Sequence, residues 1–150
     1  MIQYLIYRSR TDLTPSDAGY EHILVRSRWR NEDLSVTRYL HWEDGIFHQW
    51  IEGPAAELLI VEQIILSDRM HRDVTILDRG KASVREFEGW SMAASASENP
   101  SLFNFMASDG TPSRDHSAYA QTVLHFMKQH LQQTAGVSGY DQSAGRASSA

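Results

Sequence analysis

The sequence predicts an α+β fold: a ferredoxin-like β-α-β-β-α-β-β sheet with two helices on one face and C-terminal helices capping the other. Strand-like and helix-like patterns alternate in this order along residues 1–93. The first strand-like run is apolar on both of its faces, which is typical of a sheet that is covered on both sides. Residues 116–133 then show the spacing of an amphipathic helix, which can supply the second cover.

Each element follows from a local pattern. The first helix is predicted to begin at Thr14, which can cap it, with Pro15 in the first helical position. The pair Asp44-Gly45 predicts a tight hairpin, and Pro54 begins the second helix. The predicted strands cover residues 2–7, 34–42, 46–51, 74–77 and 87–92, and the predicted helices cover residues 14–31, 54–68, 101–106 and 116–133.

The chain is expected to form one main domain, residues 1–93, followed by two shorter parts. Residues 94–133 supply the capping helices. Residues 134–150 are Ser, Gly, Ala and Gln with almost nothing to bury, so disorder is expected there. A length of 150 residues suits one ordinary domain.

Composition excludes several classes of protein. The net charge of −5 and the pI of about 5.7 argue against a nucleic-acid partner. The absence of cysteine excludes disulfides, zinc fingers and any thiol nucleophile or thiol–flavin adduct. The seven histidines lack metal-ligand spacing, so no metal is expected. No signal peptide is recognisable and the longest apolar stretch is broken by Glu62, so a cytoplasmic protein without a membrane span is expected.

Four polar residues fall at positions that the pattern assigns to the core. Ser27 and Asn31 continue the apolar stripe of the first helix, Gln49 lies between two hydrophobes, and Tyr7 ends the first strand. Buried amides and hydroxyls need partners, because leaving one unpaired costs about 1–3 kcal/mol. Two interpretations remain open here: a self-satisfied network with buried water, or a pocket for a flat heteroaromatic ligand.

Three arginines cluster at the end of the same helix, at positions 26, 28 and 30. Such a cluster is usually a solvated face that also stabilises the negative end of the helix. It could alternatively hold one phosphate group.

Four separated motifs carry a family resemblance. They are LIYRS near the start, FHQWIEG, DRMHRDV and FEGWSM, in the order and at the spacing of the BLUF domain, a blue-light sensor that uses flavin. The chain resembles that family over residues 1–93. The resemblance implies FAD bound non-covalently between the two helices of a ferredoxin-like domain.

The resemblance also implies which residues are photoactive. Tyr7 resembles the light-driven electron donor, and Gln49 resembles the amide that relays the proton and then changes its hydrogen bonds to the flavin. Trp90 and Met92 match a pair that can exchange places near Gln49, and we expect them to share one side of the last strand.

Further positions are implied to bind the cofactor. Asn31 resembles the residue that holds the polar edge of the ring. Ser27, Asp68 and His71 match positions that line the flavin and its ribityl region. Arg30 matches a position that can contact the phosphates.

One residue departs from the family pattern. The second strand carries Thr37-Arg38 where the family usually has Thr-Gly. Glycine inside a strand often permits a close approach of the backbone. We expect the Arg38 side chain to point out to solvent or towards the C-terminal helices.

We therefore expect a short photoreceptor that is not an enzyme. Its signal should pass through the sheet and the C-terminal helices to a partner protein or to a homodimer or larger homo-oligomer. Two alternatives have other functions on the same fold: an acylphosphatase-like hydrolase, and a colourless regulatory module that binds a small metabolite. The colour of the purified protein separates them from a flavoprotein.

Overall fold

The structure of the chain, a computed structural model, describes residues 1–96, 101–109 and 115–133. Within the first helix, only the backbone is described for residues 28 and 30–33. The expected disordered tail, residues 134–150, lies outside the described residues.

A five-stranded sheet forms the centre of the molecule, with the strand order β4-β1-β3-β2-β5. Neighbouring strands are antiparallel except β2 and β5, which run parallel. The strands are β1 Ile2–Arg10, β2 Thr37–Glu43, β3 Ile46–Gly53, β4 Arg72–Ala82 and β5 Ala93–Ala96. Asp44 and Gly45 connect β2 to β3 with φ angles of 52° and 73°, as a tight hairpin turn requires.

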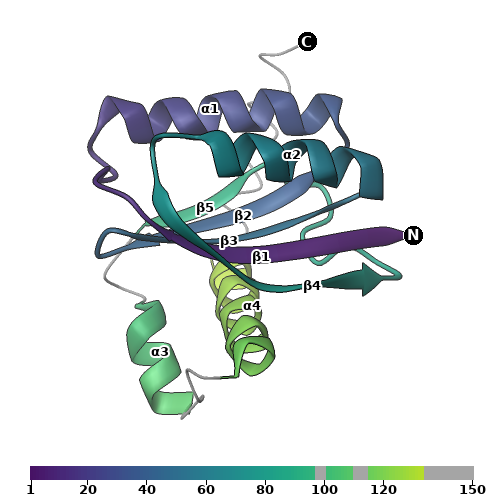
Figure 1. Cartoon of the computed structure of the whole chain (residues 1–150). Coiled ribbons are helices and arrows are strands. Elements are labelled where there is room, and N and C mark those ends of the chain that lie inside the picture. The colour runs from purple at the N-terminus through teal and green to yellow at the C-terminus, as the bar shows by residue number, and fades with distance from the viewer. Residues whose placement is uncertain (97–100, 110–114, 134–150) are drawn as a thin grey trace.

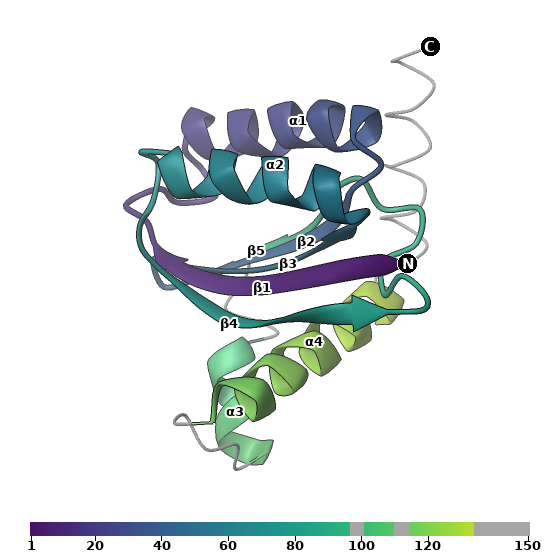
Figure 2. The ribbon, with the colours of Figure 1, turned by 45° about the vertical axis from the view of Figure 1, so that its right-hand side comes forward.

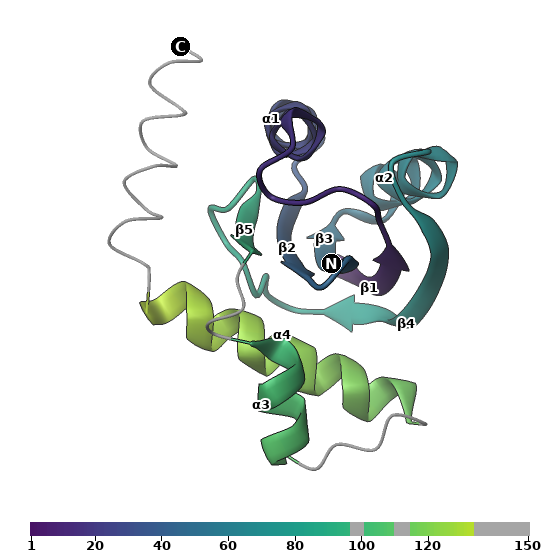
Figure 3. The same cartoon turned by 90° about the vertical axis from the view of Figure 1, so that its left-hand side faces the viewer.

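Helices cover both faces of this sheet (Figures 1 and 2). Helix α1 (Ala18–Asp33) and helix α2 (Ala55–Ser67) lie side by side on one face. Helix α3 (Leu102–Asp109) and helix α4 (His116–Gln133) lie on the other, as the view along the strands shows (Figure 3). The predicted α+β fold with two helices on one face and capping helices on the other is confirmed.

The apolar core is divided by the sheet. The cluster against α3 and α4 contains Ile6, Tyr39 and Trp50 from the sheet. Helix α4 contributes Val123 and Met127, both fully buried. The predicted apolar stripe of α4 is therefore confirmed. Two smaller clusters lie on the opposite face, below α1 and α2.

The start of α1 and the last strand differ from the prediction. Residues 14–17 form a turn in which the Asp17 N–H donates to the Thr14 carbonyl at 2.9 Å, so the helix begins at Ala18 and not at Thr14. Residues 87–92 are bends and not the fifth strand, which lies at residues 93–96 instead. The chain turns at Glu88 and Gly89, where the Trp90 N–H donates to the Phe87 carbonyl at 3.0 Å. The Glu52 carboxylate accepts the N–H groups of Glu86 and Phe87, so these two groups are not offered to a neighbouring strand.

Glu52 is a buried carboxylate that is fully used by hydrogen bonds. The backbone N–H groups of Glu86 and Phe87 donate to it at 2.8 and 2.7 Å. Its other donors are the Trp50 indole at 3.0 Å and the Thr37 hydroxyl at 2.9 Å. Glu52 thereby attaches the bends before β5 to the end of β3.

We predict that Glu52→Ala lowers the free energy of unfolding by at least about 3 kcal/mol, since it leaves several buried donors without an acceptor. Glu88→Ala is the matched control in the same bends: its carboxylate is 81% exposed, and we expect a change within about 0.5 kcal/mol. Urea denaturation of the two variants measures both values. Equal losses would contradict the role given to Glu52.

Candidate functional site

A pocket opens to solvent between α1, α2 and the sheet. Strands β1, β2 and β3 form its floor, and α1, α2 and the segment after α2 form its walls. Its lining residues are Tyr7, Ile23, Arg26, Ser27, Arg38, Leu40, Phe47, Gln49, Ile64, Ile65, Asp68, Met70 and His71. Apolar side chains and a few polar groups therefore converge in one place, as in typical ligand sites.

Tyr7 and Gln49 meet on the floor of this pocket. They are directly opposite each other in the β1–β3 ladder, so their side chains lie on the same face of the sheet. The Tyr7 hydroxyl donates a hydrogen bond to Gln49 Oε1, and both residues are buried. Burial raises the pKa of Tyr7, Arg38 opposes this rise, and Asp68 adds to it. Tyr7 is therefore a neutral hydroxyl donor at ordinary pH.

The amide nitrogen of Gln49 is buried and has no hydrogen-bond partner among the residues that the structure describes. Its carbonyl oxygen is already taken by Tyr7, so the two N–H donors of the amide remain. A buried donor without an acceptor costs about 1–3 kcal/mol. The site is thus suited to a ligand that places a hydrogen-bond acceptor beside Gln49.

His71 and Asp68 form one wall of the pocket and are held by their neighbours. The His71 Nε2–H donates to the Ile65 carbonyl at 2.7 Å, so Nδ1 is left to accept from the Ser9 hydroxyl, also at 2.7 Å. The Asp68 carboxylate accepts the Met70 N–H at 2.9 Å. Because both ring nitrogens of His71 are engaged within the protein, this ring contributes shape to the pocket.

Of the seven residues implied to bind a cofactor, the structure brings five together in the pocket: Tyr7, Ser27, Gln49, Asp68 and His71. The side chains of Arg30 and Asn31 lie outside the described part of the chain, although their backbone belongs to α1. Arg26 lines the pocket from α1, with an exposed side chain. The sequence marked Arg26 only as part of a basic cluster.

The expectation for Arg38 is wrong. Its side chain is 5% exposed and lines the pocket, so it points neither to solvent nor to the C-terminal helices. The physical reason is the alternation of side chains along β2, which places Arg38 on the same face as Leu40, another lining residue. The spacing of two from Leu40 was the signal in the sequence that could have located it.

The expectation for Trp90 and Met92 is also wrong in its geometry. Both precede β5, and they pack on opposite faces of the sheet. Trp90 packs against the cluster between the sheet and α3 and α4, whereas Met92 is buried beside Leu40 and Phe47. Neither lines the pocket, so they do not form a pair beside Gln49 in this structure.

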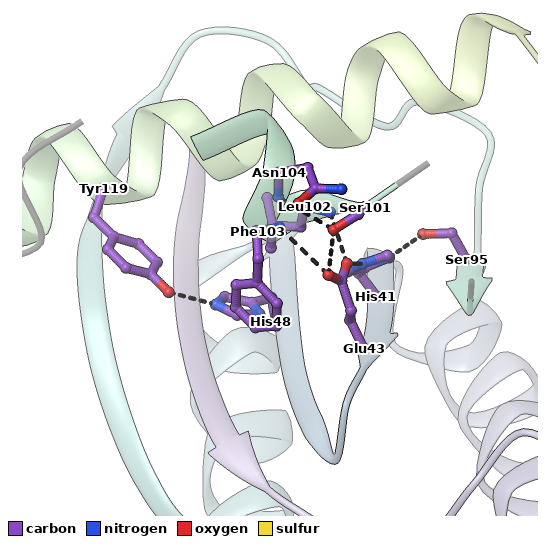
Figure 4. A network of polar contacts seen from close by, with 9 residues as sticks. All are labelled: His41, Glu43, His48, Ser95, Ser101, Leu102, Phe103, Asn104 and Tyr119. Atoms are coloured by element: carbon purple, nitrogen blue, oxygen red, sulfur yellow. Dashed lines mark hydrogen bonds and ion pairs between the residues drawn. The ribbon is translucent and has the colours of Figure 1, made fainter. Parts of the chain in front are cut away.

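The face of strands β2 and β3 that points away from the pocket carries a second set of buried polar residues (Figure 4). Glu43 at the end of β2 accepts hydrogen bonds from the Ser101 hydroxyl and from the Leu102 N–H at 2.6 Å, and so caps the start of α3. His41 bridges Glu43, at 2.9 Å, and Ser95 of β5, at 2.6 Å. Burial raises the pKa of Glu43, but these hydrogen bonds outweigh it and lower the pKa below its usual value.

His48 connects the central strand to α4. Its Nε2 lies 2.8 Å from the Tyr119 hydroxyl, and the ring is fully buried (Figure 4). His48 directly precedes Gln49 on β3, so the two side chains point to opposite faces of the sheet. One strand therefore contacts the pocket on one side and α4 on the other.

Comparison with protein families gives one match, over residues 2–93, to the family described as BLUF, sensors of blue-light using FAD. No curated protein sequence matches the chain. The match confirms the resemblance drawn from the four motifs.

Solved structures of BLUF proteins share the fold. BlrB, a BLUF protein in its dark state, is 26% identical with a TM-score of 0.69, and the alignment covers 83% of this chain and 96% of BlrB. BlrP1 of Klebsiella pneumoniae, with FMN and cyclic diGMP, is 33% identical with a TM-score of 0.58 over 64% of this chain. The aligned part is only 26% of BlrP1, so this chain spans about a quarter of that protein. Photo-activated BlsA, at 20% identity and a TM-score of 0.71, covers 86% of this chain and 94% of its own and shows the fold alone.

We predict that stability falls as the pH falls from about 6.5 towards 3, because burial, with His41 and Arg8 nearby, lowers the pKa of His48 from 6.5 to about 3. In that range the unfolded chain binds one more proton at His48 than the folded chain does, so the free energy of unfolding drops by up to about 1.4 kcal/mol per pH unit. Burial also lowers the pKa of His41, which adds a loss of the same sign.

Urea denaturation between pH 7 and 5 measures this slope. His48→Gln should reduce it, whereas His116→Gln, which changes an exposed histidine, should leave it unchanged. An unaltered slope in His48→Gln would contradict the assignment.

Proposed function

The chain belongs to the BLUF family of blue-light sensors, and from this premise we propose that it is a photoreceptor that binds FAD non-covalently between α1 and α2. The observation that carries the proposal is the buried Gln49 amide, whose N–H donors have no acceptor among the described residues. A flavin ring has carbonyl and ring-nitrogen acceptors along one edge, and these fit an amide donor. The apolar walls at Ile23 and Ile65 fit the flat faces of such a ring.

We propose that Tyr7, Ser27, Gln49, Asp68 and His71 hold the flavin, together with Asn31 at the polar edge of the ring and Arg30 at the phosphates. Bound flavin supplies the absorption of blue light. The chain supplies the Tyr7–Gln49 hydrogen bond, in which the Tyr7 hydroxyl proton lies against Gln49 Oε1. Rotation of the Gln49 amide would replace the N–H donors with the carbonyl acceptor at the pocket surface, and the Tyr7 hydroxyl oxygen would then accept a hydrogen bond from the amide nitrogen. The hydrogen bond to the ligand then changes without net chemistry.

The signal is proposed to leave through the β2–β3 hairpin. A change in the backbone at Gln49 acts directly on His48, which contacts Tyr119 of α4. The geometry therefore favours β3 as the path from the pocket to α4. Light then selects between two arrangements of similar energy, one of which holds α4 less tightly.

The domain is a sensor and not a catalytic domain, so we propose that its output passes to a partner protein or through a homo-oligomer such as a dimer. BlrP1 shows the family in a much longer chain, which is consistent with output to other domains. Among the described helices, none is long and apolar enough to cross a bilayer. We propose a cytoplasmic location.

We predict that the purified chain is yellow and releases FAD on heating, because the cofactor is held without a covalent bond. Chromatography of the released flavin distinguishes FAD from FMN. A folded and colourless protein would contradict the proposal and would favour the hydrolase or metabolite-binding alternatives.

We predict a small reversible red shift of the flavin absorbance under blue light, which is lost in Tyr7→Phe and in Gln49→Leu. Each substitution removes one member of the hydrogen-bonded pair and keeps nearly the same volume. Tyr20→Phe is the matched control, because Tyr20 is also a buried tyrosine but does not line the pocket, and it should keep the shift. A normal shift in Tyr7→Phe or Gln49→Leu would show that the relay is wrongly assigned.

We predict that light increases amide hydrogen exchange in α4, residues 116–133. Tyr119→Phe removes the hydrogen bond to His48 and keeps the ring. This variant should therefore show a normal absorbance shift and a smaller light-dependent change in exchange. Identical exchange of α4 in dark and lit wild type, with a normal absorbance shift, would mean that the output leaves by another surface.

A further inference from the structure

Arg38 is a buried cation that lines the pocket. The other charged residues of the lining are Asp68 and the exposed Arg26, and the rest of the lining is apolar or polar without a formal charge, apart from the His71 ring. Arg38 extends from β2 on the face that carries the pocket floor, with Leu40 two residues further on. The position matters because the family usually has glycine there, which brings no side chain and no charge.

The charge of Arg38 is permanent and lies away from bulk water. A guanidinium remains protonated in proteins, so the pocket carries this charge at every ordinary pH. Because the side chain is only 5% exposed, its field acts through protein and not through bulk water. The field reaches the photoactive pair, since Arg38 works against the effect of burial on the pKa of Tyr7.

We propose that Arg38 sets the charge of the flavin pocket: its buried guanidinium stabilises added negative charge on the bound flavin and so raises the reduction potential of the flavin. The inference rests on the proposed function, because it requires that the chain binds flavin. Reduction adds two electrons to the ring, and the ring becomes more negative whenever it takes up fewer than two protons. A fixed cation in the site favours that state, and protein charge near the ring is one of the means by which flavin electronics are tuned.

Arg38 is therefore proposed to act on the flavin through its charge. The test separates the effect of this charge from the effect of the side-chain volume. The full-length protein is saturated with FAD and reduced stepwise by dithionite against a reference dye, and the two-electron midpoint potential is measured. Arg38→Met keeps a long unbranched side chain and removes the charge, while Arg38→Lys keeps the charge. Arg38→Gln is a second neutral variant in case Arg38→Met does not fold.

The chain offers a matched control in Arg26, which lines the same pocket with an exposed side chain. Arg26→Met removes the same charge from a position where water screens it, so its effect on the potential should be much smaller.

We expect Arg38→Met and Arg38→Gln to lower the equilibrium constant for reduction by at least roughly tenfold, which is a fall of about 30 mV for a two-electron couple. Arg38→Lys should stay close to wild type. Equal shifts of the potential in Arg38→Lys and Arg38→Met would overturn the proposal, because the effect would then follow volume and not charge. An unchanged potential in both neutral variants, Arg38→Met and Arg38→Gln, would also overturn it. A wild-type chain that takes up no FAD would contradict the proposed function itself. If the wild type binds FAD but its potential does not change on substitution of Arg38, only this inference is contradicted.

Discussion

The burial of β3 on both of its faces is the constraint on which the rest of the structure depends. Every residue from Phe47 to Gly53 is buried, because β1 and β2 flank the strand and helices cover both sides of the sheet. Each polar side chain on it must therefore find a partner inside the protein or in a ligand. His48 finds Tyr119, and Glu52 finds the bends before β5. Gln49 finds Tyr7 for its oxygen only, so the strand that organises the core also leaves the amide nitrogen and its N–H donors for a ligand.

Two buried carboxylates attach the second half of the chain to the β2–β3 hairpin. Glu43 lies beside the hairpin turn and caps α3, whereas Glu52 lies at the opposite end and holds the backbone of Glu86 and Phe87. Both carboxylates are on the face that α3 and α4 cover, where each accepts backbone N–H groups that would otherwise be buried without a partner. The hairpin is thus a common attachment for β5 and α3, and a change in its twist reaches both.

Local patterns in the sequence predicted most of the fold, and long-range side chains decided what they missed. The apolar alternation and the Asp44-Gly45 pair specify the hairpin by themselves, and the stripe of α4 predicts its buried face. Residues 87–92 have the composition of a strand, but the carboxylate of Glu52, far away in the sequence, accepts the N–H of Phe87, and the Trp90 N–H turns back to the Phe87 carbonyl. The pocket floor at Tyr7 and Gln49 was predictable because polar residues stood at core positions. Arg38 was placed wrongly because a charge was expected outside, although its register with Leu40 placed it inside.

The same alternation explains how a pocket and a distant helix can be coupled without a continuous chain of side chains. Side chains on opposite faces of one strand do not contact each other, so Gln49 and His48 communicate only through the backbone that they share. A small rotation of that peptide moves both side chains in opposite directions, and packed cores respond to such shifts by changing between discrete arrangements. Strand β2 has the same organisation, with Arg38 towards the pocket and His41 towards α3 and β5. We propose that the hairpin is the shared element through which the pocket and α4 act on each other, because coupling between two sites requires an element whose arrangement both of them bias.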